Sequence, residues 1–306
     1  MKSLMESLLD DDLVNKTDEI IKDNIKQFLK NTYIGHAHCE ISEHPNKDDK
    51  YEVSTAKYIE VKNPNITSLT NGSFVWIEVR GDFNCSGCSS LKSLEGAPKE
   101  VGKDFECPGC SSLKSLKGAP EKVGGSFYCS HCNSLTSLED APEKVRKNFN
   151  CSDCDSLTSL EGAPKKVGGS FSCNNCDYLT SLKGAPEKVG GFNCIYCESL
   201  KSLEGAPKEV SGTFDCSYCK SLKSLNGVPE KVGKDFDCSE CTSLKSLEGA
   251  PEKVGGSFRC NSNKYLTSLE GAPKEVGDRF YCYDCAGKFT KEDVKKISNV
   301  KNNIIC

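Results

Sequence analysis

Apolar residues recur at fixed positions along most of this chain. A typical unit has Val101, Phe105, Cys107 and Leu113, with mainly polar or charged residues between them. The unit is repeated ten times, and successive units are 22 residues apart except at one step of 21. The short step falls in a predicted turn, at 189–192, where the chain has lost one residue. The first cysteines of the ten units are Cys85, Cys107, Cys129, Cys151, Cys173, Cys194, Cys216, Cys238, Cys260 and Cys282.

Each unit predicts a short strand, a bend and a return. Phe105, Glu106 and Cys107 alternate between apolar and polar side chains, which is typical of a half-buried strand. Gly118-Ala119-Pro120 indicates a turn. One unit has too few apolar residues to fold alone, so we expect the units to stack into a solenoid with one continuous core. Ten parallel strands about 4.8 Å apart would form a sheet roughly 50 Å long, which we expect to line a concave face.

The residues outside the units predict a cap at each end. Ile21, Ile25, Phe28 and Leu29 have helical spacing, and Thr290 can cap a second helix near the other end. The N-terminal helices could cap the solenoid or dock on another protein. We divide the chain into a helical N-terminal segment and linker (1–50), a degenerate capping repeat without the paired cysteines (51–82), the ten-unit solenoid (83–288) and a C-terminal helical cap (289–306).

The repeat resembles a known family. Its pattern V-x-x-x-F-x-C-x-x-C-x-x-L is similar to the leucine-rich-repeat pattern L-x-x-L-x-L-x-x-N/C-x-L, with Cys110 at the Asn/Cys position. The stretch at 157–171 looks like the short repeats of phage and bacterial leucine-rich-repeat proteins. It is more distantly similar to the repeats of secreted bacterial ubiquitin-ligase effectors, but those proteins carry a separate catalytic domain, and we do not expect their activity here. The resemblance implies short parallel β-strands on the concave face and a turn-like, irregular convex side.

The balance of charge argues against nucleic acid and membrane surfaces as partners. The chain has 40 Lys and Arg against 44 Asp and Glu, for a net charge of -4. No segment has the roughly 20 consecutive apolar residues that a membrane-spanning helix needs. The first residues run into Asp10, Asp11 and Asp12 and do not resemble a signal peptide. We therefore expect a cytoplasmic monomer, in the host cytoplasm if phage-encoded, whose 21 cysteines are reduced thiols.

The cysteines allow two interpretations. One C-x2-C pair ends at Cys88 and the next begins at Cys107. The interval between these two pairs is within the spacing expected of a four-thiolate zinc site. The same spacing follows from the repeat itself, and Asn263 replaces the second cysteine of one pair. Asparagine would abolish a thiolate ligand, whereas in a leucine-rich-repeat bend it bonds backbone groups. We expect buried structural thiols and no cofactor. A further metal alternative, the polar segment 36–44 with three histidines and one cysteine, has no recognisable ligand spacing.

Positions that vary between units predict a binding surface. Phe, Cys, Leu, Gly and Pro recur from unit to unit, whereas outward residues on the strand and in the bend change and include several tyrosines and carboxylates. No catalytic motif is present, so we expect a non-enzymatic protein-recognition scaffold that binds a protein partner with a basic or polar rim. A zinc-thiolate structural protein and a self-assembling structural component are the alternatives. The candidate binding residues are Tyr128, His131, Ile195, Tyr196, Asp215, Tyr218, Asp237, Glu240, Tyr281 and Tyr283.

Overall fold

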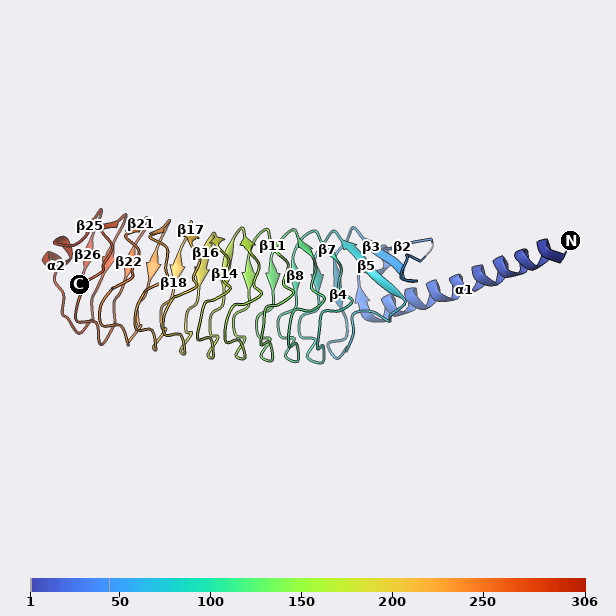
Figure 1. Cartoon of the computed structure of the whole chain (residues 1–306), viewed down its shortest axis with the longest axis horizontal. Coiled ribbons are helices and arrows are strands. Elements are labelled where there is room, and N and C mark those ends of the chain that lie inside the picture. Colours follow the sequence, from blue (N-terminus) through green and yellow to red (C-terminus); the bar gives the residue numbers. More distant parts are fainter. Residues whose placement is uncertain (1, 44) are drawn as a thin grey trace.

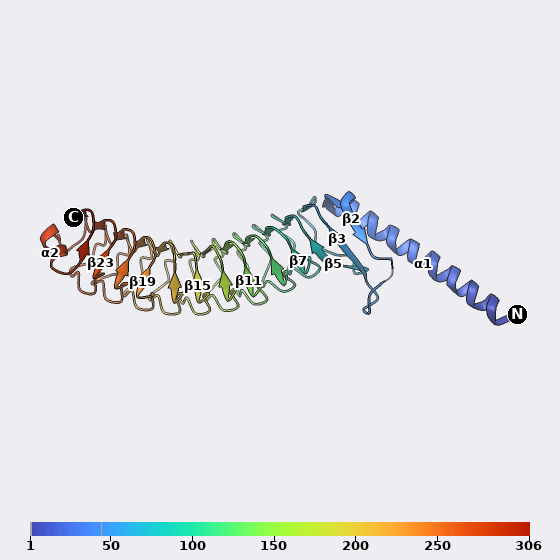
Figure 2. The same ribbon diagram turned by 90° about the horizontal axis from the view of Figure 1, so that it is seen from above.

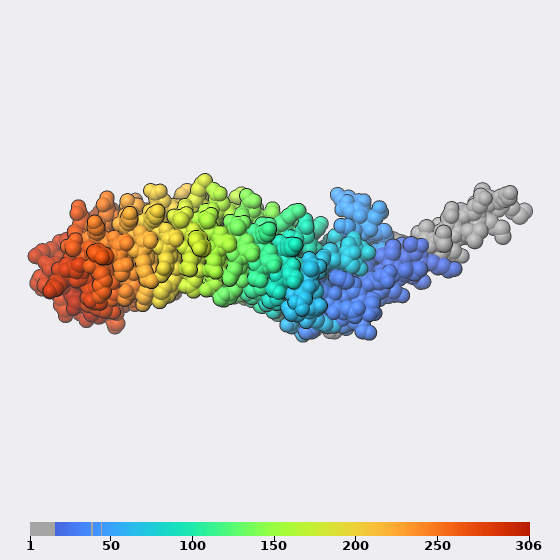
Figure 3. Space-filling model, turned by 90° about the horizontal axis from the view of Figure 1, so that it is seen from below, coloured from blue at the N-terminus to red at the C-terminus, as the bar shows by residue number. Residues whose placement is uncertain are grey.

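The computed structural model shows an elongated β-solenoid (Figure 1). The structure describes residues 2–43 and 45–306, and the side chains of residues 16–37, 39–43 and 45–306. Each repeat contributes one strand to each of two sheets, and among the described residues each sheet has 13 strands. The rod bends gently along its length (Figure 2), and its coils form successive bands across the surface (Figure 3). The concave position of the binding face stays a prediction.

The first sheet contains the strands that the repeat predicts, and we call it the phenylalanine sheet. Neighbouring coils pair in parallel without a shift in register, as Phe105 lies opposite both Phe83 and Phe127. In spatial order its strands are β1 (Tyr33–Ile34), β4 (Ile59–Val61), β6 (Phe83–Asn84), β8 (Phe105–Glu106), β10 (Phe127–Tyr128), β12 (Phe149–Asn150), β14 (Ser170–Ser172), β16 (Gly191–Asn193), β18 (Phe214–Asp215), β20 (Phe236–Asp237), β22 (Phe258–Arg259), β24 (Phe280–Tyr281) and β26 (Ile304–Ile305).

The side of each coil expected to be irregular forms a second sheet, which we call the valine sheet. One valine of each coil is buried here. The backbone N–H of the residue after this valine can donate to the valine carbonyl of the preceding coil, as Gly124 N does to Val101 O at 2.8 Å. In spatial order its strands are β2 (Cys39–Ile41), β3 (Tyr51–Thr55), β5 (Phe74–Val79), β7 (Glu100–Val101), β9 (Lys122–Val123), β11 (Lys144–Val145), β13 (Lys166–Val167), β15 (Lys188–Val189), β17 (Glu209–Val210), β19 (Lys231–Val232), β21 (Lys253–Val254), β23 (Glu275–Val276) and β25 (Asn299–Val300).

The core is built from columns of identical side chains. The phenylalanine rings of successive coils, from Phe83 to Phe280, are fully buried with centroids 5.0 to 5.7 Å apart. The two cysteines and two leucines of the repeat are buried beside them. Burying a phenylalanine contributes about 1.5–3 kcal/mol, and each ring contacts the coils before and after it. Stability therefore depends on neighbouring coils, as expected for a repeat array.

The N-terminal end is closed by a helix and by strands that reverse direction. The helix α1 (Lys2–Thr32) buries Ile25 and Leu29, and its Phe28 ring lies 5.8 Å from that of Phe74. The 3-10 helix η1 (His36–His38) follows β1. Two strands of the predicted linker, β1 and β2, pair in antiparallel fashion with β4 and β3 of the segment that follows. In the segment 51–82, β4 pairs in parallel with β6 and β5 with β7, so this segment adds one strand to each sheet next to the first cysteine-containing coil.

The C-terminal end differs from the predicted helical cap. The helix α2 (Lys291–Lys295) begins after Thr290, whose hydroxyl accepts a bond from Asp293 N at 3.3 Å, so the predicted helix start is confirmed. The helix has only five residues, and the chain then returns to both sheets as β25 and β26. Val294 is buried, whereas Ile297 is 42 % exposed. A helical cap over the last coil is therefore not shown, and the final apolar residues pair in one more coil instead.

Candidate protein-binding surface

The bend between the two cysteines of each coil holds one residue in the left-handed backbone region. In the first two coils this residue is Gly87 and Gly109, with φ of 70° and 72°. In the next eight coils φ is 53° to 60° but the residue is not glycine. These positions, which we call the bend column, hold His131, Asp153, Asn175, Tyr196, Tyr218, Glu240, Ser262 and Asp284. A left-handed residue with a side chain costs about 1 kcal/mol or more relative to a relaxed backbone.

Two tyrosines of the bend column form an exposed aromatic pair. The backbone N–H groups of Tyr196 and Tyr218 each donate to a carbonyl in the next coil, at 3.1 and 2.9 Å, which sets the two residues one above the other. Their ring centroids lie 4.4 Å apart with an interplanar angle of 21°. Tyr196 is 42 % exposed. The pKa of Tyr218 is raised mainly by the neighbouring phenol of Tyr196, and to a smaller extent by partial burial and by the carboxylate of Glu240. The pair presents a flat surface that is apolar with a polar edge.

Two aspartates lie in register beside this pair on the phenylalanine sheet. Asp215 and Asp237 are directly paired between β18 and β20. Asp215 accepts bonds from the hydroxyl and the backbone N–H of Ser217, at 2.7 and 2.9 Å, and Asp237 accepts the same two bonds from Ser239. Burial raises the pKa of Asp215, while the bonds from Ser217 lower it. The carboxylates are therefore held rigidly at some electrostatic cost.

Part of the predicted surface is one continuous patch. The structure brings together Tyr196, Tyr218, Asp215, Asp237 and Glu240 on three successive coils, and we call this group the tyrosine–aspartate patch. Ile195 precedes Tyr196 in the bend and is half-buried at the edge of the patch.

The other predicted residues lie in two separate groups. His131 contacts Asp153 in the next coil, with 3.7 Å between Nε2 and Oδ2, and the coils of Asp153 and Asn175 separate it from Tyr196. Tyr128 is half-buried in the His131 coil. Near the far end, the ring of Tyr281 lies 5.1 Å from the Arg259 guanidinium, and Tyr283 is 43 % exposed. The structure does not place these residues in the tyrosine–aspartate patch.

Within the ten cysteine-containing units, two exposed tyrosines were missed by sequence reasoning. Tyr178 is 65 % exposed and Tyr265 is 63 % exposed. Each stands directly before a buried leucine, where most coils have serine. That departure from the repeat is the signal that could have identified them.

The thiols act as donors that join one coil to the next. The second cysteine of a coil donates to the carbonyl of the first cysteine one coil earlier, as Cys176 Sγ does to Cys151 O at 3.4 Å. Asn263 makes the equivalent bond to Cys238 O at 3.0 Å, which confirms that the Asn/Cys position bonds backbone groups. Burial raises the pKa of thiols such as Cys151 and Cys238 well above the ordinary value. These protonated thiols therefore have backbone acceptors within the core.

Within the part of the chain that the structure describes, no three His, Cys, Asp or Glu side chains are arranged to hold a metal ion. In the segment 36–44, the side chains of His38 and His44 lie outside the described residues.

Among the described residues, no helix is long and apolar enough to cross a membrane.

Comparisons with known proteins find one structural likeness. No protein-family model matches the chain, and no curated protein matches its sequence. A search of solved structures finds a leucine-rich repeat protein from Bacteroides ovatus ATCC 8483, at 13 % sequence identity and a TM-score of 0.24. The alignment covers 87 % of this chain and 98 % of that one. This match is to the class of protein that the repeat resembles, but the two chains do not superpose closely enough to transfer a function.

Proposed function

We propose that this chain is a non-enzymatic scaffold that binds a protein partner through the tyrosine–aspartate patch. The observation that supports this most is the stacked pair of Tyr196 and Tyr218 in the bend column. In the first two coils, Gly87 and Gly109 adopt the same left-handed backbone conformation at that position without a side chain. Exposed aromatic rings that are already ordered lose little side-chain entropy on binding, and tyrosine is enriched in binding hot spots. The carboxylates of Asp215, Asp237 and Glu240 favour a partner with a basic or polar rim.

The energetic balance within the patch supports a role beyond folding. Each bend tyrosine costs about 1 kcal/mol or more in backbone conformation, while one ring stack contributes about 0.5–1.5 kcal/mol. The stack therefore offsets the strain of about one of the two residues. Burial of Asp215 also opposes its ionisation. These side chains add little net stability, which is expected where residues serve binding.

The test compares partner capture by variants that keep the fold. Because glycine fits the left-handed bend, a Tyr196→Gly, Tyr218→Gly double variant removes the rings without straining the backbone. A Tyr178→Ser, Tyr265→Ser variant is the matched control, since it removes two exposed tyrosines outside the patch and restores the common serine. Proteins captured from a lysate by wild type and both variants are identified and quantified, and circular dichroism verifies the fold of each bait.

The proposal predicts a partner that the glycine variant loses and the serine control retains. In the wild-type background, Asp215→Ala should weaken its capture and reduce its dependence on salt, since an acidic rim steers a basic partner. Capture of the same proteins by all three baits, or equal loss from both variants, would contradict the role of this patch.

A further inference from the structure

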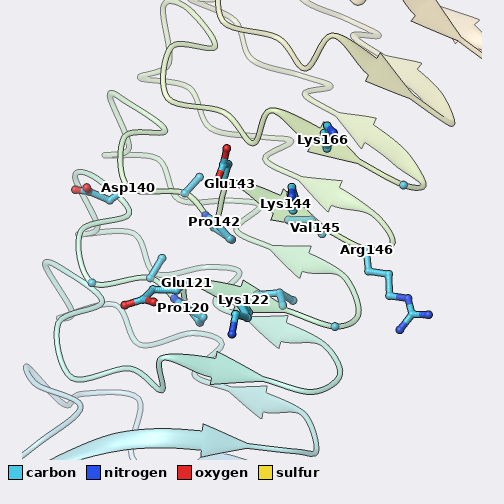
Figure 4. Close-up of a pocket in the computed structure, with 16 residues that line it drawn as sticks. Pro120, Glu121, Lys122, Asp140, Pro142, Glu143, Lys144, Val145, Arg146 and Lys166 are labelled. Carbon is cyan, nitrogen blue, oxygen red and sulfur yellow. The ribbon is translucent and has the colours of Figure 1, made fainter.

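A groove crosses the valine sheet on another part of each coil. It has a volume of about 1050 Å³ and extends over the strands β9, β11 and β13 (Figure 4). Its floor is apolar and formed by Ala and Pro residues of the turns and by buried valines of the strands. These floor residues are Ala119, Pro120, Val123, Ala141, Pro142 and Val145.

One side of the groove carries a row of lysines. In the valine sheet, Lys166 lies opposite Lys144 in one neighbouring coil and Lys188 in the other. The two outer lysines of the row are neutralised, because Lys122 pairs with Glu100 at 2.6 Å and Lys188 with Glu209 at 2.7 Å. Lys144 and Lys166 instead have lysines as their neighbours along the sheet. Like charges directly opposite each other are destabilising, so this arrangement is costly until an anion covers it.

The central coil of the groove replaces two structural glycines. Asp140, with φ of 66°, stands where the adjacent coils have Gly118 and Gly162. Arg146 stands where they have glycine after the buried valine, and Figure 4 shows its side chain extending from one end of the groove. The backbone is tight there, because a Cβ on Gly124 would lie 2.2 Å from the carbonyl oxygen of Gly102. A charged side chain thus replaces glycine at two positions that favour glycine, on opposite sides of the groove.

We infer that this groove binds an extended acidic peptide segment of a partner protein. Carboxylates of the peptide would contact Lys144, Lys166 and Arg146, and its apolar side chains would pack on the proline and alanine floor. Glu121 and Glu143 line the opposite side, together with Asp140 (Figure 4). Those carboxylates disfavour a uniform polyanion such as nucleic acid, whereas a peptide can place carboxylates on one side only. This site is independent of the tyrosine–aspartate patch.

The test measures binding of a fluorescent peptide of alternating glutamate and valine by anisotropy, with a lysine–valine peptide of equal length as the matched probe. We expect the full-length chain to bind the acidic peptide and not the basic one. The Lys144→Glu, Lys166→Glu variant should weaken binding by about tenfold or more, because two favourable pairs become repulsive. A Lys231→Glu, Lys253→Glu variant changes the same sheet positions in a second, smaller groove, where Lys253 is paired with Glu275, and should bind like wild type.

Further variants separate this site from the other surface. Arg146→Gly restores the glycine of neighbouring coils and should weaken binding severalfold while the circular dichroism spectrum is kept. The Tyr196→Gly, Tyr218→Gly variant should bind the peptide normally, so failure of one proposal leaves the other standing. The inference is overturned if wild type does not bind the acidic peptide, if the Lys144/Lys166 and Lys231/Lys253 variants bind equally, or if single-stranded DNA binds more tightly than the peptide.

Discussion

Replacing Asn263 by cysteine should stabilise the solenoid, although asparagine makes more hydrogen bonds there. Asn263 Nδ2 donates to Cys238 O at 3.0 Å and to Cys260 O at 2.9 Å, but its buried Oδ1 has no partner among the described residues. A cysteine keeps the bond between coils, as Cys241 shows with its 3.1 Å bond to Cys216 O. The change loses one bond, about 1 kcal/mol, and removes an unpaired buried oxygen, which costs about 1–3 kcal/mol. The net gain is about 1 kcal/mol.

Urea unfolding followed by circular dichroism measures this change. The Asn263→Cys variant should unfold at a higher urea concentration with an unchanged slope, whereas Asn263→Ala should lose about 2–3 kcal/mol because the carbonyl of Cys238 loses this donor. Amide hydrogen exchange near residues 260–266 should slow in the cysteine variant and accelerate in the alanine variant. If both variants are destabilised equally, the thiol does not replace the amide as a donor, and the account of the paired cysteines is refuted.

Three further predictions concern the core, the last coil and the acidic surface. Phe149→Ala should destabilise the chain by about 3–5 kcal/mol, measured by urea unfolding, because its ring is fully buried between two other rings. The sulfurs of Cys282 and Cys306 lie 2.6 Å apart, so a mild thiol oxidant should join them with loss of two hydrogens, and Cys306→Ser should abolish this change in intact mass. Burial raises the pKa of Asp215, so its contribution to stability is present below the unfolded-state pKa and is lost as pH rises through the folded-state pKa. Asp215→Asn should remove that component from the pH dependence of the urea midpoint.

The repeat predicts one half of each coil better than the other. Phe105 and Glu106 show the alternation of a strand, and the structure places β8 there. The opposite strand, Lys122–Val123, has only one buried side chain, and Gly-rich sequence follows it, so no alternation distinguishes it from a turn. Its regular structure comes from backbone bonds to neighbouring coils, and a single repeat read alone does not contain that information. The same limit explains the C-terminal end, where Ile304 joins the phenylalanine sheet by pairing with Phe280.

The candidate site was predictable as a set of variable residues but not as a grouping. Sequence spacing identified Tyr196 and Tyr218 as outward positions one coil apart, and their 4.4 Å ring separation follows from that spacing. The separation of His131 from this pair also follows from the order of the coils. The left-handed conformation of the bend could have been inferred from Gly87 and Gly109 at the same repeat position. The sequence alone does not show which lysines lie beside a glutamate and which lie beside another lysine. Lys144 and Lys166 become neighbours only when the valine sheet forms.

Departures from the repeat separate the residues that fold this chain from those that present a surface. A 22-residue coil needs a left-handed residue at its bend, and glycine meets that need without steric cost, as in the first two coils. Side chains occupy the same position in the next eight coils, each at a cost of about 1 kcal/mol or more. The Phe and Cys columns supply the stability that tolerates this cost, because they recur along the array. Residues such as Tyr218 in the bend and Arg146 in the groove, which replace glycine without filling the core, are therefore those whose loss should affect binding before folding.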